Sequence, residues 1–356
     1  MLKYRLIVGL AIVAVLIGIL WLDSDRSQGW PLAPGSTPPG LFLALVAVVI
    51  IPLGLREMRG LLAKENVTIS LRITVVAAAL CMLWPWIEQV AQSIDQRHAA
   101  LQTQLLQEGK MSGPTGVAEA QRTQQDLEQV EHSPWYITSR VFRSVKPEYL
   151  VPTILALSLV AAVVKHSRHR RVDGAMANAG GTLLAIVYLG VLPGFFLPIC
   201  MTHSAWMVLA VVAIVKGADI GAYATGRLVG RHKLIPWLSP GKTVEGFIGG
   251  LLLAGLVGAV IGSWLQASRG GVNGDPSRWG GVSATLAVFV GAGAGILLGA
   301  VGQLGDLLES LLKRDAGVKD SGAVPGFGGV LDILDSPLLA APVAYWLLKL
   351  ILRPPG

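Results

Sequence analysis

The stretch GVSATLAVFVGAGAGILLGAVGQL, residues 281–304, decides the fold, because it runs for 24 residues without a charged side chain. A helix of about 20 apolar residues crosses the hydrocarbon core of a bilayer, so this stretch is predicted to span a membrane. The segment that follows, GDLLESLLKRDAGVKDSGAVPGFGGVLDILDS (305–336), holds five of the twelve aspartates. Carboxylates this dense beside a bilayer need counter-charge, which metal ions or substrate phosphates commonly supply.

The composition of the whole chain agrees with a membrane protein. Hydrophobic residues make up 53% of the 356 residues and charged residues only 14%, whereas soluble domains average about 25% charged residues. Nine apolar segments of spanning length occur, at 6–22, 40–55, 70–91, 149–164, 176–198, 204–225, 244–265, 281–304 and 336–352. We therefore predict an all-α polytopic membrane protein with about nine transmembrane helices. The net charge of +7 then reports on topology and does not indicate nucleic-acid binding.

The distribution of Lys and Arg predicts the orientation of these helices. With a cytoplasmic N-terminus, 17 of the 29 Lys and Arg residues fall on cytoplasmic segments and 5 on short outside segments. Short cytoplasmic loops are enriched in Lys and Arg, and long loops count little. The expected arrangement is therefore a multi-pass protein of the cell (inner) membrane, with the N-terminus in the cytoplasm and the C-terminus outside.

Three groups of polar residues lie on or near the predicted cytoplasmic face. The first is KGADIGAY (216–223), in which Lys216 and Asp219 are three residues apart on one helix face and can neutralise each other. Ionisable groups inside membrane helices are costly, which favours a functional role, although an ion pair that only fixes helix packing would look the same.

The second group is SPGKTVEG (239–246), at the start of the seventh apolar segment. Ser239 is expected as a helix N-cap and Pro240 as the first helical residue. Free N–H groups at a helix start, together with Lys242 and the Thr243 hydroxyl, suit a phosphate. A capped interfacial helix with a single lysine is the alternative interpretation.

The third group is the charged segment itself. Glu309, Lys313 and Arg314 are expected on adjacent faces of a helix that continues the eighth apolar segment, and Asp306 begins this part of the helix. A glycine-rich turn at 325–329 would then lead back into the membrane with two aspartates on one helix face. Hard divalent cations prefer such oxygen ligands. The expected metal ligands are Asp306, Asp332 and Asp335, with Asp320 close by.

At these residues the chain resembles the phosphatidate cytidylyltransferases, also called CDP-diacylglycerol synthases. The resemblance covers about 150–352, and three motifs occur in the order found in the family. The matching residues are Asp219, Ala222, Tyr223, Ser239, Pro240, Lys242, Thr243, Glu245, Gly246, Ser310, Lys313, Arg314, Lys319, Asp320, Pro325, Gly326, Gly328, Gly329, Asp332 and Asp335. Two positions differ, because the family usually has His in place of Phe327 and Arg in place of Ile333.

The resemblance implies the transfer of a cytidylyl group from CTP to phosphatidate in the bilayer, with Mg²⁺ as cofactor and a second cation left open. The expected catalytic residues are Asp306, Asp332, Lys242 and Lys319. The residues expected to bind the phosphates of CTP or phosphatidate are Ser239, Lys242, Thr243, Lys313, Arg314, Lys319 and Asp219. A homodimer is left open.

The apolar segments and the polar stretch between them suggest three regions. Residues 1–91 would form the first three membrane helices, 92–148 an extramembrane helical hairpin inserted between spans, and 149–356 the catalytic membrane domain with helices four to nine. Cys81 and Cys200 lie in apolar runs and are expected to be buried without a disulfide.

Two other classes of protein share some of these features. A CTP-dependent kinase of a polyprenol or phytol-type lipid would also need a membrane site, a nucleotide and metal ions, but it would release CDP and a lipid monophosphate. A transporter could use Lys216 and Asp219 as part of an ion path. Because the motifs gather on one face and do not follow a path across the membrane, the sequence favours an enzyme over a transporter.

Overall fold

The computed structural model describes residues 2–28, 30, 36–108, 114–133, 136, 140, 149–168, 172–267, 283–318 and 329–352, without the side chains of 2–12 and 114–116. The elements are α1 (Leu2–Arg26), α2 (Leu41–Lys64), α3 (Leu71–Glu108), α4 (Pro114–Glu131), α6 (Leu150–Ser167), α7 (Ala175–Ile186), the π-helix η2 (Val187–Val191), α8 (Leu192–Gly194), α9 (Phe196–Thr202), α10 (Ala205–Val229), β1 (Lys233–Ile235), β2 (Ser239–Thr243), α11 (Val244–Ala267), α12 (Ala284–Asp315) and α13 (Val330–Ile351).

The helical membrane fold predicted from the sequence is confirmed. Within the described residues, eight helical stretches are long and apolar enough to cross a membrane, and they coincide with the second to ninth expected segments. The fifth stretch, Ala175–Thr202, combines α7, η2, α8 and α9. The first expected segment, 6–22, lies within α1. The chain is therefore a multi-pass membrane protein.

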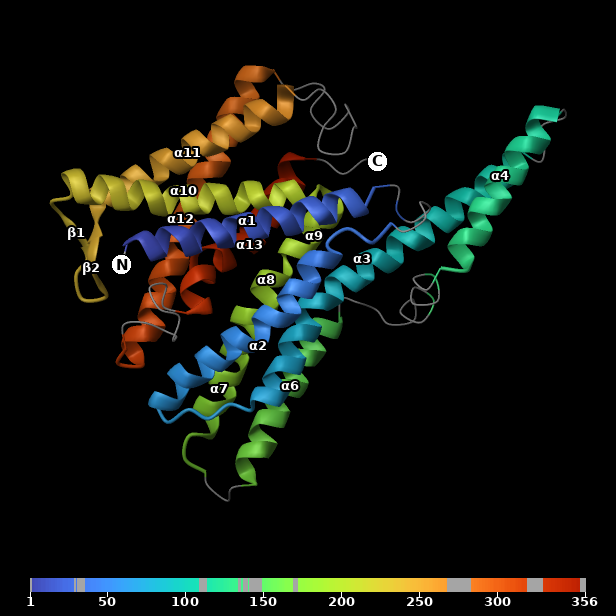
Figure 1. Cartoon of the computed structure of the whole chain (residues 1–356). Coiled ribbons are helices and arrows are strands. Elements are labelled where there is room, and N and C mark those ends of the chain that lie inside the picture. The colour runs from blue at the N-terminus through green and yellow to red at the C-terminus, as the bar shows by residue number, and fades with distance from the viewer. Residues whose placement is uncertain are drawn as a thin grey trace.

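The described ends of the helices lie at two opposite ends of the molecule. In Figure 1, the left and lower side holds β1, β2, the C-terminal ends of α2, α6 and α12, and the N-terminal end of α7. The C-terminal ends of α1 and α11 and the α3–α4 hairpin lie on the upper and right side. This alternation is the one that the charge pattern predicts, and it brings the three polar groups to one end.

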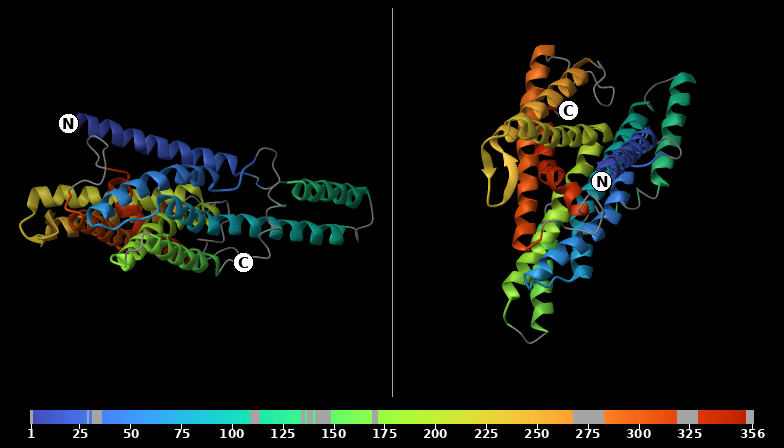
Figure 2. Two further views of the ribbon diagram at one scale, coloured as in Figure 1. Left: turned by 90° about the horizontal axis from the view of Figure 1, so that it is seen from below. Right: turned by 60° about the vertical axis from the view of Figure 1, so that its left-hand side comes forward.

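Helices α3 and α4 pack together as a helical hairpin. Helix α3 is 38 residues long, so it runs well beyond the length needed for a membrane span. Helix α4 packs back against the extension of α3, and the pair projects from the rest of the molecule in both views of Figure 2. Cys81 and Cys200 are buried and free, as expected.

Close backbone contacts hold α11 against α12, next to the site. A Cβ atom on Gly258 would collide with the carbonyl oxygen of Gly291, and one on Gly295 would collide with that of Ala254. Small residues four apart let two membrane helices approach closely, so that dispersion contacts replace the missing hydrophobic driving force. The contact fixes the N-terminal end of α11 beside the C-terminal half of α12.

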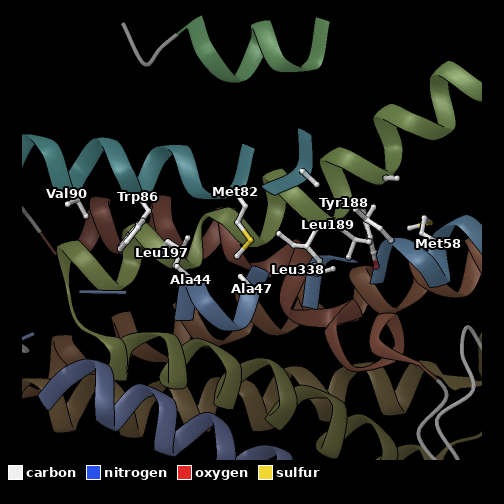
Figure 3. Packing of buried hydrophobic residues seen from close by; sticks show 14 of the residues in the cluster. Ala44, Ala47, Met58, Met82, Trp86, Val90, Tyr188, Leu189, Leu197 and Leu338 are labelled. Carbon is white, nitrogen blue, oxygen red and sulfur yellow. The ribbon is translucent and has the colours of Figure 1, made fainter. Parts of the chain in front are cut away.

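A second core lies between α2, α3, α13 and the segment from η2 to α9. Figure 3 shows Met82, Leu189 and Leu338 close together there, with Ala47 beside them. The π-helix η2 precedes Pro193, whose ring nitrogen has no hydrogen to donate. This core holds the start of α13 near the ends of α2 and α12.

Candidate active site

The segment that carries Lys242 is a strand and not a helix start. Ser239–Thr243 forms β2, which pairs with β1 in an antiparallel hairpin, and α11 begins at Val244. The expected capping role of Ser239 and helical position of Pro240 are therefore wrong. Thr243 is the cap instead, because its Oγ1 accepts the Gly246 N–H at 3.1 Å. Hydrogen bonds to β1 pair the backbone groups that an earlier helix start would have paired within the helix. An edge strand tolerates Pro.

A pocket lies between this hairpin and the helices α10, α11 and α12. It encloses about 1060 Å³ of space, part of it open to solvent. Its lining brings together two of the three polar groups and the start of the third. The polar residues on its wall are Asp219, Tyr223, Arg227, Ser239, Lys242, Thr243, Gln303 and Asp306.

Lys242 and Asp306 meet in this pocket. The Lys242 Nζ lies 2.8 Å from Asp306 Oδ2, and both side chains are partly exposed. The pair joins the β2 strand to α12, two segments more than 60 residues apart in the sequence. A lysine positioned this way can neutralise a phosphate when the carboxylate takes a cation.

A second network links α10 to α13. Lys216 Nζ lies 3.1 Å from Asp219 Oδ2 and 3.5 Å from Asp335 Oδ1, so the expected pairing of Lys216 with Asp219 is confirmed. Ser336 Oγ lies 3.3 Å from an Asp219 oxygen and 3.1 Å from an Asp335 oxygen, so its single hydrogen can be donated to either carboxylate. The network holds the two carboxylates close together at the edge of the pocket.

A third network surrounds Lys313, one turn beyond Glu309 on α12. Lys313 Nζ lies 2.5 Å from Glu309 Oε2 and also forms an ion pair with Asp332. Asp332 in turn accepts the Gly329 N–H at 2.6 Å, which caps the first turn of α13. The helical continuation through Glu309, Lys313 and Arg314 is confirmed, because α12 extends to Asp315.

Three carboxylates in these networks converge. Oxygen atoms of Asp306, Glu309 and Asp335 lie within 4.8 Å of one another. Glu309 and Asp335 are buried, and Asp306 is half-buried. Oxygen ligands at this spacing suit a hard divalent cation, since such ions bind carboxylates from several elements at once. This part of the site could bind a metal.

Neighbouring segments hold the start of α13 in place. Glu57, on α2, accepts the N–H groups of Val330 at 2.9 Å and Leu331 at 3.0 Å. Arg314 donates through Nε to the carbonyl of Leu238, in the turn between β1 and β2, at 3.4 Å. Helix α2 and the hairpin therefore both fix the segments that carry the charged residues.

The structure brings together most of the residues expected from the sequence. Asp219, Ser239, Lys242, Thr243 and Asp306 line one pocket, and Asp335 lies next to it through Lys216. Lys313, Asp332 and Arg314 lie on the α12–α13 side. Lys319, Asp320 and Phe327 fall outside the described residues, and Ile333 is half-buried on α13.

Two residues of the site are not among those expected from the sequence. Glu309 is expected on this helix but not in a metal site, although its spacing of three from Asp306 puts both on one face. Glu57 gave no signal, because its partners lie more than 270 residues away and are backbone groups.

Comparison with known proteins places this arrangement in a family. The profile of the cytidylyltransferase family matches residues 117–351. Three similar proteins are named phosphatidate cytidylyltransferase: one from Chlamydia pneumoniae is 36% identical over 48% of this chain, one from Chlamydia muridarum 32% over 57%, and one from Synechocystis 43% over 39%. The matches cover 54%, 65% and 42% of these relatives, less than two thirds of each. This chain belongs to the cytidylyltransferase family.

Proposed function

We propose that this protein is an integral membrane phosphatidate cytidylyltransferase. It would convert CTP and phosphatidate into CDP-diacylglycerol and pyrophosphate. The observation that carries the proposal is the pocket at one end of the helix bundle, where Lys242 and Asp306 meet beside two carboxylate networks. A lipid substrate needs its acyl chains in the bilayer while its phosphate meets a water-soluble nucleotide, and a polar pocket at the end of membrane helices meets this need.

The carboxylates Asp306, Glu309 and Asp335 fit Mg²⁺, because all three offer hard oxygen ligands close to one another. We propose that they hold the ion, with Asp332 and Asp320 near it. A bound Mg²⁺ would neutralise charge on the triphosphate and polarise the bond to the leaving group. The buried position of Glu309 and Asp335 keeps bulk water from competing for the ion.

In the proposed reaction an oxygen of the lipid phosphate attacks the α-phosphorus of CTP. The new P–O bond forms as the bond between the α-phosphorus and the bridging oxygen breaks, and pyrophosphate leaves with that electron pair. Transfers of this kind depend on positioning and charge neutralisation. A phosphate monoester is already largely ionised near neutral pH, so no general base is required.

Different cationic side chains would bind different phosphate groups of the substrates. Lys242 projects from β2 into the pocket and would turn from Asp306 to a phosphate of CTP. The hydroxyls of Ser239 and Thr243 lie on the same strand. We propose that Lys313, Arg314 and Lys319 neutralise the remaining phosphate charge and that Asp219 keeps Lys216 in place. The protein would lie in the cell (inner) membrane with the pocket facing the cytoplasm, where CTP is available.

An assay of the detergent-purified chain with CTP, phosphatidate and magnesium tests the proposal. Equal amounts of pyrophosphate and CDP-diacylglycerol are expected. Asp306→Asn should lower turnover at least about a hundredfold, since losing one charged ligand weakens both metal binding and charge neutralisation. Asp315→Asn, on the exposed end of the same helix, is the matched control and should remain active. No nucleotide turnover, or equal rates for both variants, would refute the proposal.

A further inference from the structure

A second polar pocket lies away from the site described above. It is formed by the C-terminal ends of α2 and α6, the segment 68–70 before α3, and the first half of α7. In Figure 1 these elements meet at the lower end of the molecule, whereas β1 and β2 lie at the left edge. The pocket encloses about 640 Å³ of space, part of it open to solvent, and shares no lining residue with the pocket beside Lys242.

The ionisable side chains that line this second pocket are all basic. Arg59, Lys165 and His166 line it, and none of its lining residues is acidic. Within the ranges that the structure describes, no carboxylate forms an ion pair with any of these three side chains. Three basic side chains from two helices therefore face one space without neutralisation, which favours an anion.

A chain of hydrogen bonds orients the histidine of this pocket. The Thr68 N–H donates to Asn178 Oδ1 at 2.6 Å, which fixes the orientation of the Asn178 amide. The Asn178 Nδ2 group must then donate to His166 Nδ1, at 2.8 Å. Because Nδ1 accepts this bond, the neutral ring carries its hydrogen on Nε2.

The Nε2–H group of His166 has no acceptor among the described residues. The Nε2 atom is also buried. A buried donor without an acceptor is unfavourable. Asn178 is itself buried, so the arrangement is built into the fold and is not a chance contact of mobile surface groups.

We propose that this pocket binds a phosphate group, and that the group belongs to an anionic lipid headgroup. His166 would donate through Nε2, and Arg59 and Lys165 would supply the charge. The pocket opens at the ends of membrane helices, where headgroups lie, and a guanidinium pairs well with phosphate oxygens. The alternative source of the same chemistry is free phosphate.

Calorimetric titration of the detergent-purified full-length chain separates these sources. The probes are soluble short-chain phosphatidylglycerol, short-chain phosphatidylcholine and inorganic phosphate. The first is expected to bind at least about tenfold more tightly than either of the others. Phosphatidylglycerol is chosen because it is not the proposed substrate, so the result does not depend on turnover. Phosphate binding as tightly as phosphatidylglycerol would overturn the lipid assignment, and no preference between the two lipids would overturn the site.

Variants locate the binding. Arg59→Ala/Lys165→Ala should weaken phosphatidylglycerol binding at least about tenfold, and His166→Leu should weaken it without a change of side-chain charge in the neutral state. Lys64→Ala/Arg72→Ala removes the same charge from exposed positions at the same end but outside the pocket, and it should bind as the wild type does. Equal losses in both double variants would overturn the proposal, because general surface charge would then explain the binding.

Discussion

At the scale of single residues, the site consists of ion pairs between lysines and carboxylates. Lys242 pairs with Asp306, Lys216 pairs with Asp335, and Lys313 bridges two acidic groups. Each lysine thus offsets carboxylate charge that would otherwise be costly beside a bilayer. In the proposed reaction these pairs would open, with a nucleotide phosphate binding the lysine and a cation binding the carboxylate.

Lys242→Ala is expected to raise the KM for CTP at least about tenfold, since a charged hydrogen bond to phosphate contributes about 1.5–3 kcal/mol. Lys242→Arg should restore only part of this affinity, because Arg presents a planar fork in place of a point charge. Steady-state kinetics over a range of CTP concentrations measures both. An unchanged KM and unchanged turnover in the alanine variant would favour a purely structural role for this lysine.

At the scale of elements, long-range contacts position the helices that carry these charges. The sequence predicted where most membrane-spanning helices lie, because apolar length and flanking charge are local properties. It misplaced the start of α11, because local capping residues in SPGKT competed with pairing to β1, which no local pattern reveals. The support that Glu57 gives to α13 is likewise a tertiary contact, invisible to local patterns.

Glu57 is expected to act as a positioning residue for α13. Glu57→Ala removes both acceptors from the N-terminus of α13 and should lower stability by about 0.5–2 kcal/mol, as loss of a helix cap does. It should lower kcat more than it changes the KM for CTP, because Glu57 lies outside the pocket of Lys242. Glu57→Gln keeps one acceptor and should be intermediate. Equal kcat in all three proteins would contradict the positioning role.

The close contact of α11 with α12 gives a matched pair of glycine variants. Gly258→Ala would place a Cβ against the Gly291 carbonyl, and this overpacking is expected to cost about 1–3 kcal/mol. A Cβ at Gly293, on the same helix as Gly291, would meet nothing within 4 Å, so Gly293→Ala should be neutral or stabilising. Thermal unfolding in detergent measures both, and equal midpoints would show that the contact is not tight.

At the scale of the whole molecule, the described helix ends alternate between two sides in Figure 1, and the distribution of Lys and Arg sets the expected orientation. We predict that the end with β1 and β2 is cytoplasmic. In intact cells a membrane-impermeant maleimide should label Glu119→Cys, on α4, and should label Lys64→Cys, at the end of α2, only after the membrane is opened. Both positions are exposed, whereas Cys81 and Cys200 are buried. The reverse pattern would invert the predicted topology.

The central claim is that the pocket transfers a cytidylyl group to a lipid phosphate. Two samples of CTP, one radiolabelled on the α-phosphate and one on the γ-phosphate, test it when each is incubated with the purified protein, phosphatidate and magnesium. The α-label is expected to enter the lipid fraction, and the γ-label is expected to stay in the aqueous fraction as pyrophosphate. Transfer of the γ-label to lipid, with the α-label left in soluble CDP, would rule out cytidylyl transfer and identify a lipid kinase.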